Sequence, residues 1–173
     1  MKSQWLIQGT GGQSIIDDGG SKRCQLTNSK WMLWNERNNL LNVEIIGLIK
    51  VGSNTNYNGG FLLRCDSSCN NAYNLRVSCN GSVKTYALYR VVAGVWTLLS
   101  NAISSESYGV YTKVRFRADG NQISVEEYIS GAWNLIQLVT DGFVITAGYS
   151  GINSNCVTGY SVQFDNIEIN ERA

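Results

Sequence analysis

The stretch Lys113-Val114-Arg115-Phe116-Arg117-Ala118-Asp119-Gly120-Asn121-Gln122-Ile123-Ser124-Val125 decides the fold class. Val114, Phe116 and Ala118 alternate with charged residues, and the alternation resumes at Ile123 after an Asp-Gly-Asn turn. A period of two is typical of a strand with one buried and one wet face, and Asp-Gly favours a tight hairpin. The stretch therefore predicts two antiparallel strands that pack on one face.

The same two-residue alternation continues on both sides of this hairpin. Alternating apolar residues predict strands at 43–51 and 73–79, whereas no long stretch shows helical spacing. Further turns are expected at Asn80-Gly81, Ala93-Gly94 and Ser130-Gly131. About a dozen short strands at such intervals predict two packed antiparallel sheets or a barrel.

The last apolar segment, residues 160–169, changes phase. Tyr160, Val162 and Phe164 share one face, but Ile167 and Ile169 fall on the other. Because a slip of one residue turns every later side chain over, we expect a β-bulge at Asp165-Asn166 or a strand that passes between sheets.

Length and composition bound the protein class. The 173 residues, 43% hydrophobic and 16% charged, suit one folded domain. We expect a single β-sandwich at 13–173 and a separate N-terminal arm at 1–12, which ends in glycines. No apolar run suits a membrane span or a signal peptide. The net charge of +1, without basic clusters, argues against a nucleic-acid partner.

Five cysteines and no histidine limit the covalent and metal chemistry. The spacing of Cys65 and Cys69 allows a small disulfide loop, and free, partly buried thiols are the alternative. Zinc is not expected, because two further ligands are missing.

A succession of weak motifs resembles the concanavalin A-like lectin/glucanase jelly rolls, including laminin-G-like domains. The motifs that carry the resemblance are 60–64, 72–75, 86–99, 113–123, 146–151 and 162–167, within roughly 14 to 170. It implies an all-β, two-sheet antiparallel jelly-roll sandwich. It also implies glycan, calcium or β-glucan sites in some members and a purely structural role in others.

The sequence does not predict an enzyme. The hydrolytic branch of the family carries acids spaced near Glu-x-Asp-x-x-Glu, and hydrolysis needs two cooperating carboxylates. Here the nearest approach is Glu126-Glu127, which as neighbours point to opposite faces of a strand and are expected to be solvated. Without histidine, no Ser-His-Asp or Cys-His arrangement is available.

Binding chemistry is better represented. Aromatic residues offer flat apolar faces for a sugar ring, and ordinary packing is the alternative; Trp96 and Trp133, each just after a turn, are the better surface candidates. The candidates are Trp96, Trp133, Tyr108 and Tyr111. Asp165 and Asn166 are weak calcium candidates, because calcium needs six to eight oxygen ligands and the acids are scattered. No other cofactor is expected.

Three functions fit these observations. The first is a structural protein of a bacteriophage virion, either a capsid decoration or a tail-associated module. It would bind other virion proteins such as the major capsid protein and form a homo-oligomer, for example a trimer. The second is a carbohydrate-binding lectin module, and the third is a glycoside hydrolase. The location expected is the virion surface, with an extracellular location as the alternative.

Overall fold

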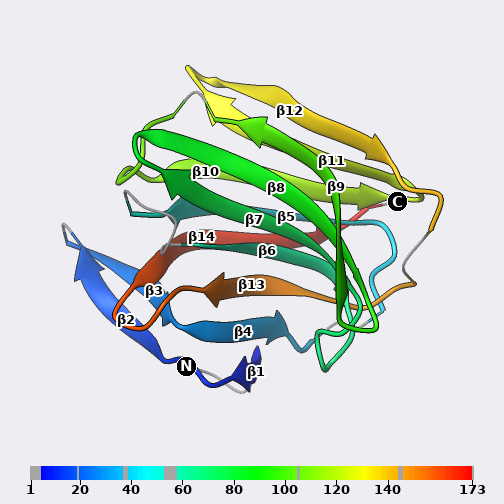
Figure 1. The fold of residues 1–173 in the computed structure, drawn as a ribbon, viewed down its shortest axis with the longest axis horizontal. Helices are drawn as coiled ribbons and strands as arrows, with labels where there is room; N and C mark the ends of the chain where they lie inside the picture. Colours follow the sequence, from blue (N-terminus) through cyan, green and yellow to red (C-terminus); the bar gives the residue numbers. More distant parts are fainter. Residues whose placement is uncertain are drawn as a thin grey trace.

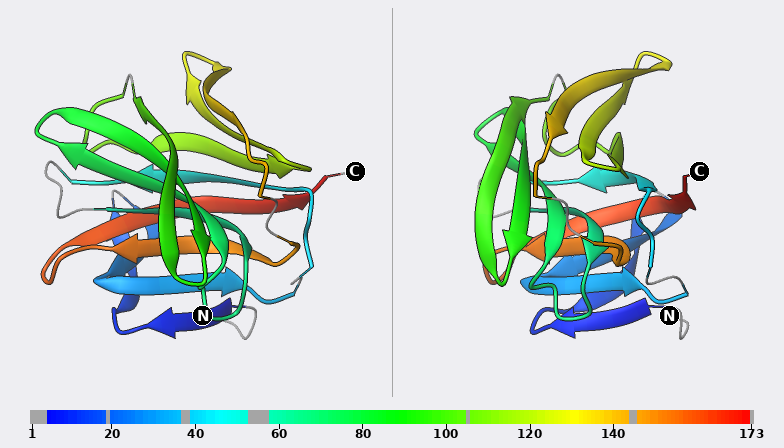
Figure 2. Two further views of the ribbon diagram at one scale, coloured as in Figure 1. Left: turned by 45° about the vertical axis from the view of Figure 1, so that its right-hand side comes forward. Right: turned by 90° about the vertical axis from the view of Figure 1, so that its right-hand side faces the viewer.

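The computed structural model describes residues 5–18, 20–36, 39–52, 58–104, 106–143 and 146–172. In these ranges the chain forms fourteen strands, which make two seven-stranded sheets packed face to face (Figures 1 and 2). The all-β sandwich predicted from the alternation is confirmed. Across the described ranges, no helix has the length and apolar character needed to cross a membrane.

Every strand pairing between named strands is antiparallel. Sheet A contains, in spatial order, β1 (Trp5–Gly9), β4 (Ser29–Trp34), β13 (Tyr149–Asn155), β6 (Asn58–Cys65), β7 (Ala72–Asn80), β8 (Val83–Val92) and β9 (Val95–Ile103). Sheet B contains β12 (Ala132–Thr140), β11 (Gln122–Ile129), β10 (Thr112–Asp119), β5 (Val43–Lys50), β14 (Ser161–Glu171), β3 (Ser21–Thr27) and β2 (Gln13–Asp18).

The predicted hairpin turns all connect neighbouring strands: β7 to β8, β8 to β9, β10 to β11, and β11 to β12. Ala93 and Gly94 both have positive φ, at 49° and 77°. Two residues of positive φ match the twist of a two-residue hairpin. This turn sets the position of β9, which carries part of the candidate site described below.

The core lies between the sheets and consists of the alternate side chains that the sequence marked as apolar. Phe61 of sheet A and Phe164 of sheet B meet edge to face there, with ring centroids 6.0 Å apart. Strand β7 shows the resulting division. Its Tyr73, Leu75 and Val77 are fully buried in the core, so the intervening Asn74 and Arg76 project from the outer face of sheet A.

The phase change near the end of the chain is a β-bulge. The register of β14 against β5 shifts between Asp165 and Glu168, and Asn166 has a φ of 49°. The bulge turns Ile167 and Ile169 back toward the core, against which both are partly buried. β14 remains in sheet B throughout, so the alternative of a strand passing between sheets does not apply.

The separate N-terminal arm expected at 1–12 is not what the described part, residues 5–12, forms. β1 is an edge strand of sheet A, in register with β4 from Trp5 opposite Trp34. Trp5 also packs against the core. The apolar character of Trp5 and Leu6 provides the physical reason, since burial of large apolar side chains favours docking over a free arm.

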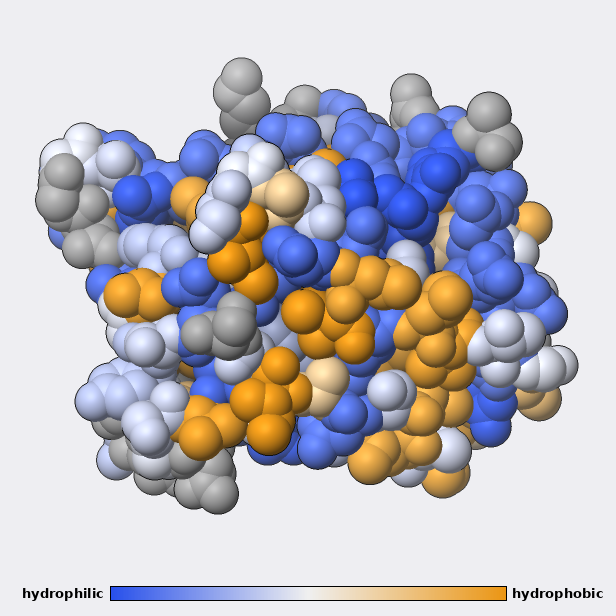
Figure 3. Space-filling view, turned by 90° about the horizontal axis from the view of Figure 1, so that it is seen from above, coloured by the Kyte–Doolittle hydropathy of each residue, from blue (hydrophilic) through white to orange (hydrophobic). Residues whose placement is uncertain are grey.

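The opposite side of the sandwich is bounded by the edge strands β9 and β12. Seen from the side on which β12 lies, apolar side chains gather on the surface (Figure 3). The exposed apolar side chains of these two strands include Val95, Leu98, Ile103, Leu135 and Leu138.

Candidate functional site

A hollow of about 340 Å³ lies on the outer face of sheet A. It crosses five adjacent strands: β6, β7, β8 and β9, which follow one another in the sequence, and β13, which comes from much later in the chain. The residues that line it are Asn58, Gly59, Asn74, Arg76, Tyr89, Trp96, Asn153 and Asn155. We call it the amide hollow, because four of these eight residues are asparagines.

Two consecutive glycines lie in the central strand β6, and Gly60, which pairs with Arg76, leaves the outer face of the sheet without a side chain there. A Cβ atom on Gly59 would collide with the Asn153 carbonyl oxygen, and one on Gly60 with the Leu75 carbonyl oxygen. Neither position therefore accepts a side chain without backbone movement. Glycine inside a strand often marks a place where a ligand or another backbone approaches closely.

Asparagine amides form much of the lining. Asn58, Asn74 and Asn153 are almost fully buried, with 4%, 1% and 4% of their surface exposed. The Asn153 Oδ1 atom is buried and has no hydrogen-bond partner among the described residues. Since buried polar atoms are normally paired, an unpaired acceptor beside a hollow is a site for an external donor. Each amide offers both donors and an acceptor.

Arg76 supplies the positive charge of the hollow. Its Nε atom is buried and has no hydrogen-bond partner in the described part of the chain. None of the described residues that line the hollow is acidic. The hollow therefore combines a free guanidinium donor with neutral amides.

Two aromatic rings lie at the β8–β9 side of the amide hollow. Tyr89 and Trp96 meet edge to face, with centroids 5.5 Å apart and an interplanar angle of 73°. Trp96 is 47% exposed. Its ring therefore offers an open apolar face next to the hydrogen-bonding groups, as ligand sites with a few convergent polar groups usually do.

The structure does not bring the four predicted aromatic residues together. Trp96 lines the amide hollow. Trp133 is part of sheet B, where it contacts Tyr128 and lies 4.4 Å from the Arg115 guanidinium. The Tyr111 hydroxyl donates to Gln163 at 2.9 Å, with Arg23 over its ring. Tyr108 is exposed between β9 and β10.

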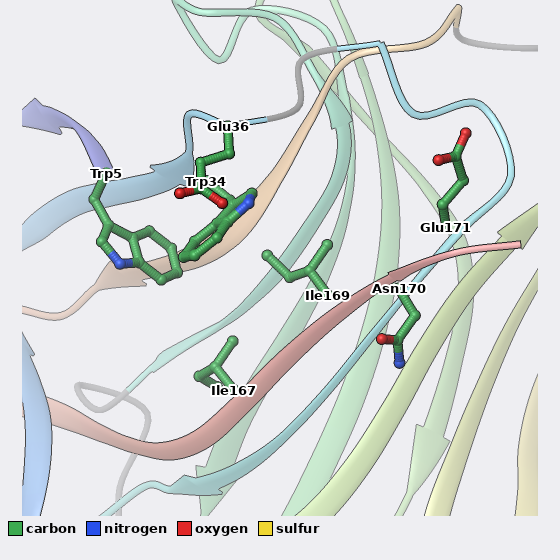
Figure 4. A pocket seen from close by; sticks show the side chains of 7 residues that line it. All are labelled: Trp5, Trp34, Glu36, Ile167, Ile169, Asn170 and Glu171. Carbon is green, nitrogen blue, oxygen red and sulfur yellow. The ribbon is translucent and has the colours of Figure 1, made fainter. Parts of the chain in front are cut away.

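A second hollow, of about 360 Å³, lies between the β1–β4 edge of sheet A and the end of β14 (Figure 4). It forms because β3 pairs with β14 only as far as Phe164, while β14 continues to Glu171. Trp5 and Trp34 meet edge to face at 5.3 Å. Glu36 lies beside Trp34, whereas the Glu171 carboxylate points away from the tryptophans. The two acids therefore do not face one another across a substrate position, as glycoside hydrolysis requires.

The expectation that Glu126 and Glu127 are solvated is wrong for Glu127. Glu127 has no exposed surface, and its Oε1 accepts hydrogen bonds from Tyr86 at 2.7 Å and Ser104 at 2.6 Å. Burial and this carboxylate raise the pKa of Tyr86 well above 10. Glu127 shares the inner face of β11 with Ile123 and Val125. The hydrogen bonds to its Oε1 offset part of the cost of burial, while Oε2 has no hydrogen-bond partner among the described residues.

Glu126 lies on the other face of β11 from Glu127, as expected. It accepts two hydrogen bonds from Arg115, at 2.5 and 2.6 Å, and these lower its pKa. Only 14% of its side chain is exposed, so it too is far from fully solvated. The two glutamates therefore belong to separate polar groups and serve no common site.

The predicted disulfide lies in the loop 65–69, and the predicted calcium site lies at the β-bulge of β14. Cys65 and Cys69 are free thiols rather than a disulfide. A hydrogen bond with Cys69 and burial both raise the pKa of Cys65. The Asp165 carboxylate forms an ion pair with Arg23. Among the described residues, no group of three acidic, cysteine or histidine side chains could hold a metal ion.

No protein-family model matches the chain, and no curated protein matches its sequence. Several solved structures do match. A carbohydrate-binding module of Bacillus subtilis, CBM66, superposes with a TM-score of 0.72 over 99% of both chains at 13% identity. The fold is that of the concanavalin A-like jelly rolls.

Other similar structures belong to larger proteins. The exoplasmic/lumenal domain of VIP36, in a form with Ca²⁺ and Man3GlcNAc bound, has a TM-score of 0.67 over 98% of this chain and 84% of that chain, at 12% identity. The GH43 BlXynB protein of Bacillus licheniformis has a TM-score of 0.66 at 13% identity, and 34% of its length is covered. At such identities the likeness establishes the fold alone.

Proposed function

We propose that this chain is a carbohydrate-binding module that binds a saccharide in the amide hollow without cleaving it. One observation carries the proposal: buried amides, an exposed tryptophan and an arginine whose Nε atom has no partner among the described residues line one hollow. Two similar structures are, by their descriptions, a carbohydrate-binding module and a domain with Man3GlcNAc bound. Both support this reading over the virion role, which stays a prediction.

The chemistry of the hollow suits a sugar ring. Vicinal hydroxyls are both donors and acceptors, and asparagine amides can complement both functions. The C–H face of a pyranose or furanose ring is apolar and packs on an indole ring. Trp96 offers such a face beside Asn74, Arg76 and Asn153. A saccharide would thus satisfy the buried Asn153 oxygen and Arg76 Nε atoms at the same time.

Binding without hydrolysis is the part of the proposal that concerns catalysis. No carboxylate belongs to the described lining of the amide hollow, and a glycosidase needs two at defined separation. The third reading, a glycoside hydrolase, is therefore less well supported at this site. The expected homo-oligomer and the expected virion-surface or extracellular location stay predictions, and light scattering of the purified chain tests the first.

A glycan array followed by calorimetry tests the proposal. The intact chain is screened with calcium and with a chelator, and the best ligand is titrated into wild type, Trp96→Ala and Trp133→Ala. We expect Trp96→Ala to weaken binding at least about tenfold, equivalent to about 1.4 kcal/mol. Trp133→Ala removes a tryptophan from an equivalent hairpin and should bind normally. Equal losses in both variants, or no glycan bound in either condition, would refute the proposal.

A further inference from the structure

We propose that the saccharide bound in the amide hollow is acidic, with a uronic-acid carboxylate held by Arg76. This inference rests on the proposed function and specifies its ligand class. It depends on three features of Arg76 among the described residues: the lack of a partner for its Nε atom, its small strand neighbours and the absence of an acid from the lining of the hollow.

Arg76 differs from four other arginines of the strands. Arg23, Arg90, Arg115 and Arg117 each form an ion pair with a carboxylate. Arg76 forms neither an ion pair nor a hydrogen bond among the described residues, and its Nε atom is buried. A guanidinium with a buried donor lacks part of its hydration, and its most favourable partner is an anion that accepts from two nitrogens at once.

The strand register leaves room for such an anion. Arg76 of β7 lies directly between Gly60 of β6 and Ala87 of β8. Neither neighbour has a side chain that reaches over the guanidinium. Any group that pairs with the arginine must therefore come from outside these two strand positions, and Arg76 lines the hollow.

The charge of the lining residues favours a negatively charged ligand. The amide hollow contains the Arg76 charge, four asparagines and two aromatic rings, and no described acid. A neutral sugar would leave the positive charge uncompensated, whereas a carboxylate would pair with it through charge-assisted hydrogen bonds. The planar carboxylate of a hexuronate matches the guanidinium fork. The asparagines remain available for the ring hydroxyls.

Matched acidic and neutral oligosaccharides test this inference on the full chain. The probes are oligogalacturonate, oligoglucuronate and oligomannuronate, each paired with its fully methyl-esterified form, which is neutral and of nearly the same shape. A sulfated neutral oligosaccharide and the neutral glycans of the array complete the panel. We expect one acid to bind at least about tenfold more tightly than its ester, and its affinity to fall with added salt.

Substitutions of Arg76 test whether this residue causes the preference for the acidic oligosaccharide over its ester. Arg76→Gln should remove the preference for the acid over its ester, and Arg76→Lys should restore it only in part, because lysine lacks the planar fork. Lys22→Gln changes the net charge equally at an exposed position outside the hollow and should behave as wild type. Thermal melts of all three variants verify folding.

The results distinguish failure of the acidic-ligand inference from failure of saccharide binding itself. If a neutral glycan binds at Trp96 as tightly as any acid, and Arg76→Gln does not alter the ratio, the acidic-ligand inference is wrong and the binding function stands. Tighter binding of the sulfated probe than of every uronate also overturns the carboxylate assignment. If no probe binds, the proposed function itself fails.

Discussion

Gly60 lies directly opposite Arg76 in the register of β6 and β7. Gly60 places no side chain beside Arg76, and the floor on which a ligand would rest is lower there. The candidate site thus depends as much on an absent side chain as on those present.

Replacement of Gly60 should cost stability. A Cβ atom there would meet the Leu75 carbonyl oxygen, so Gly60→Ala is expected to lower the free energy of unfolding by about 1–3 kcal/mol. Gly142→Ala is the control, because nothing lies within 4 Å of a Cβ at that position. Urea denaturation compares the two. A Gly60→Ala variant as stable as the control would show that β6 does not need glycine for its packing.

Loss of the buried carboxylate should be more damaging than loss of its neighbour. Glu127→Ala leaves the Tyr86 and Ser104 hydroxyls without their acceptor. It also removes the charge that raises the pKa of Lys84 against the lowering effect of burial. We expect a loss of about 3–5 kcal/mol in unfolding free energy. Glu126→Ala should cost clearly less, since Arg115 gains access to water; a reversed order in denaturant melts would contradict this account.

The ion pair of Glu126 and Arg115 should make stability fall at acid pH. The hydrogen bonds from Arg115 lower the pKa of Glu126 below its usual 4.5. A folded-state pKa below the unfolded one means that the pair contributes fully above pH 4.5 and loses its contribution as the pH falls through the folded value. The Tm difference between wild type and Glu126→Gln should therefore shrink from about pH 6 to about pH 3. A constant difference would mean that Glu126 does not titrate with folding.

The Cys24 thiol should be inert in the folded protein. Burial raises the pKa of Cys24 to about 11, so at pH 8 hardly any thiolate is available for alkylation. Iodoacetamide should label Cys24 slowly until guanidinium unfolds the chain. Intact mass without a reductant should then show five labels, because all five cysteines are free. Three labels, with Cys65 and Cys69 blocked, would restore the disulfide prediction.

The fold was predictable from sequence because its signals are local. Alternation at 113–125 and glycine turns at 93–94 depend only on strand geometry and turn conformation. The phase change at Asp165-Asn166 likewise marked the bulge. The position of Glu127 was also in the pattern, since it shares parity with Ile123 and Val125. The general preference of glutamate for solvent led to the wrong expectation there.

The amide hollow was not predictable in the same way. It joins Asn153 of β13 to Asn58 of β6 and Arg76 of β7, and the spatial order of these strands is not sequential. The alternation of residues along β7 places Asn74 and Arg76 on the outer face of the sheet. The sequence of β7 alone does not show which other strands complete that face. Of the two tryptophans proposed from their positions after turns, Trp96 lines the hollow and Trp133 does not, because the hairpin of Trp133 belongs to the other sheet.

The five tryptophans permit one direct test of where a ligand binds. In a nitrogen-15 heteronuclear spectrum each indole N–H gives its own signal, and a saccharide identified on the array is titrated into the intact chain. Binding in the amide hollow predicts that the Trp96 indole signal and the Asn153 side-chain amide shift together, while Trp5, Trp34 and Trp133 stay in place. Shifts at Trp5 and Trp34, or at Trp133, with Trp96 unmoved, would place the ligand elsewhere and contradict the central claim.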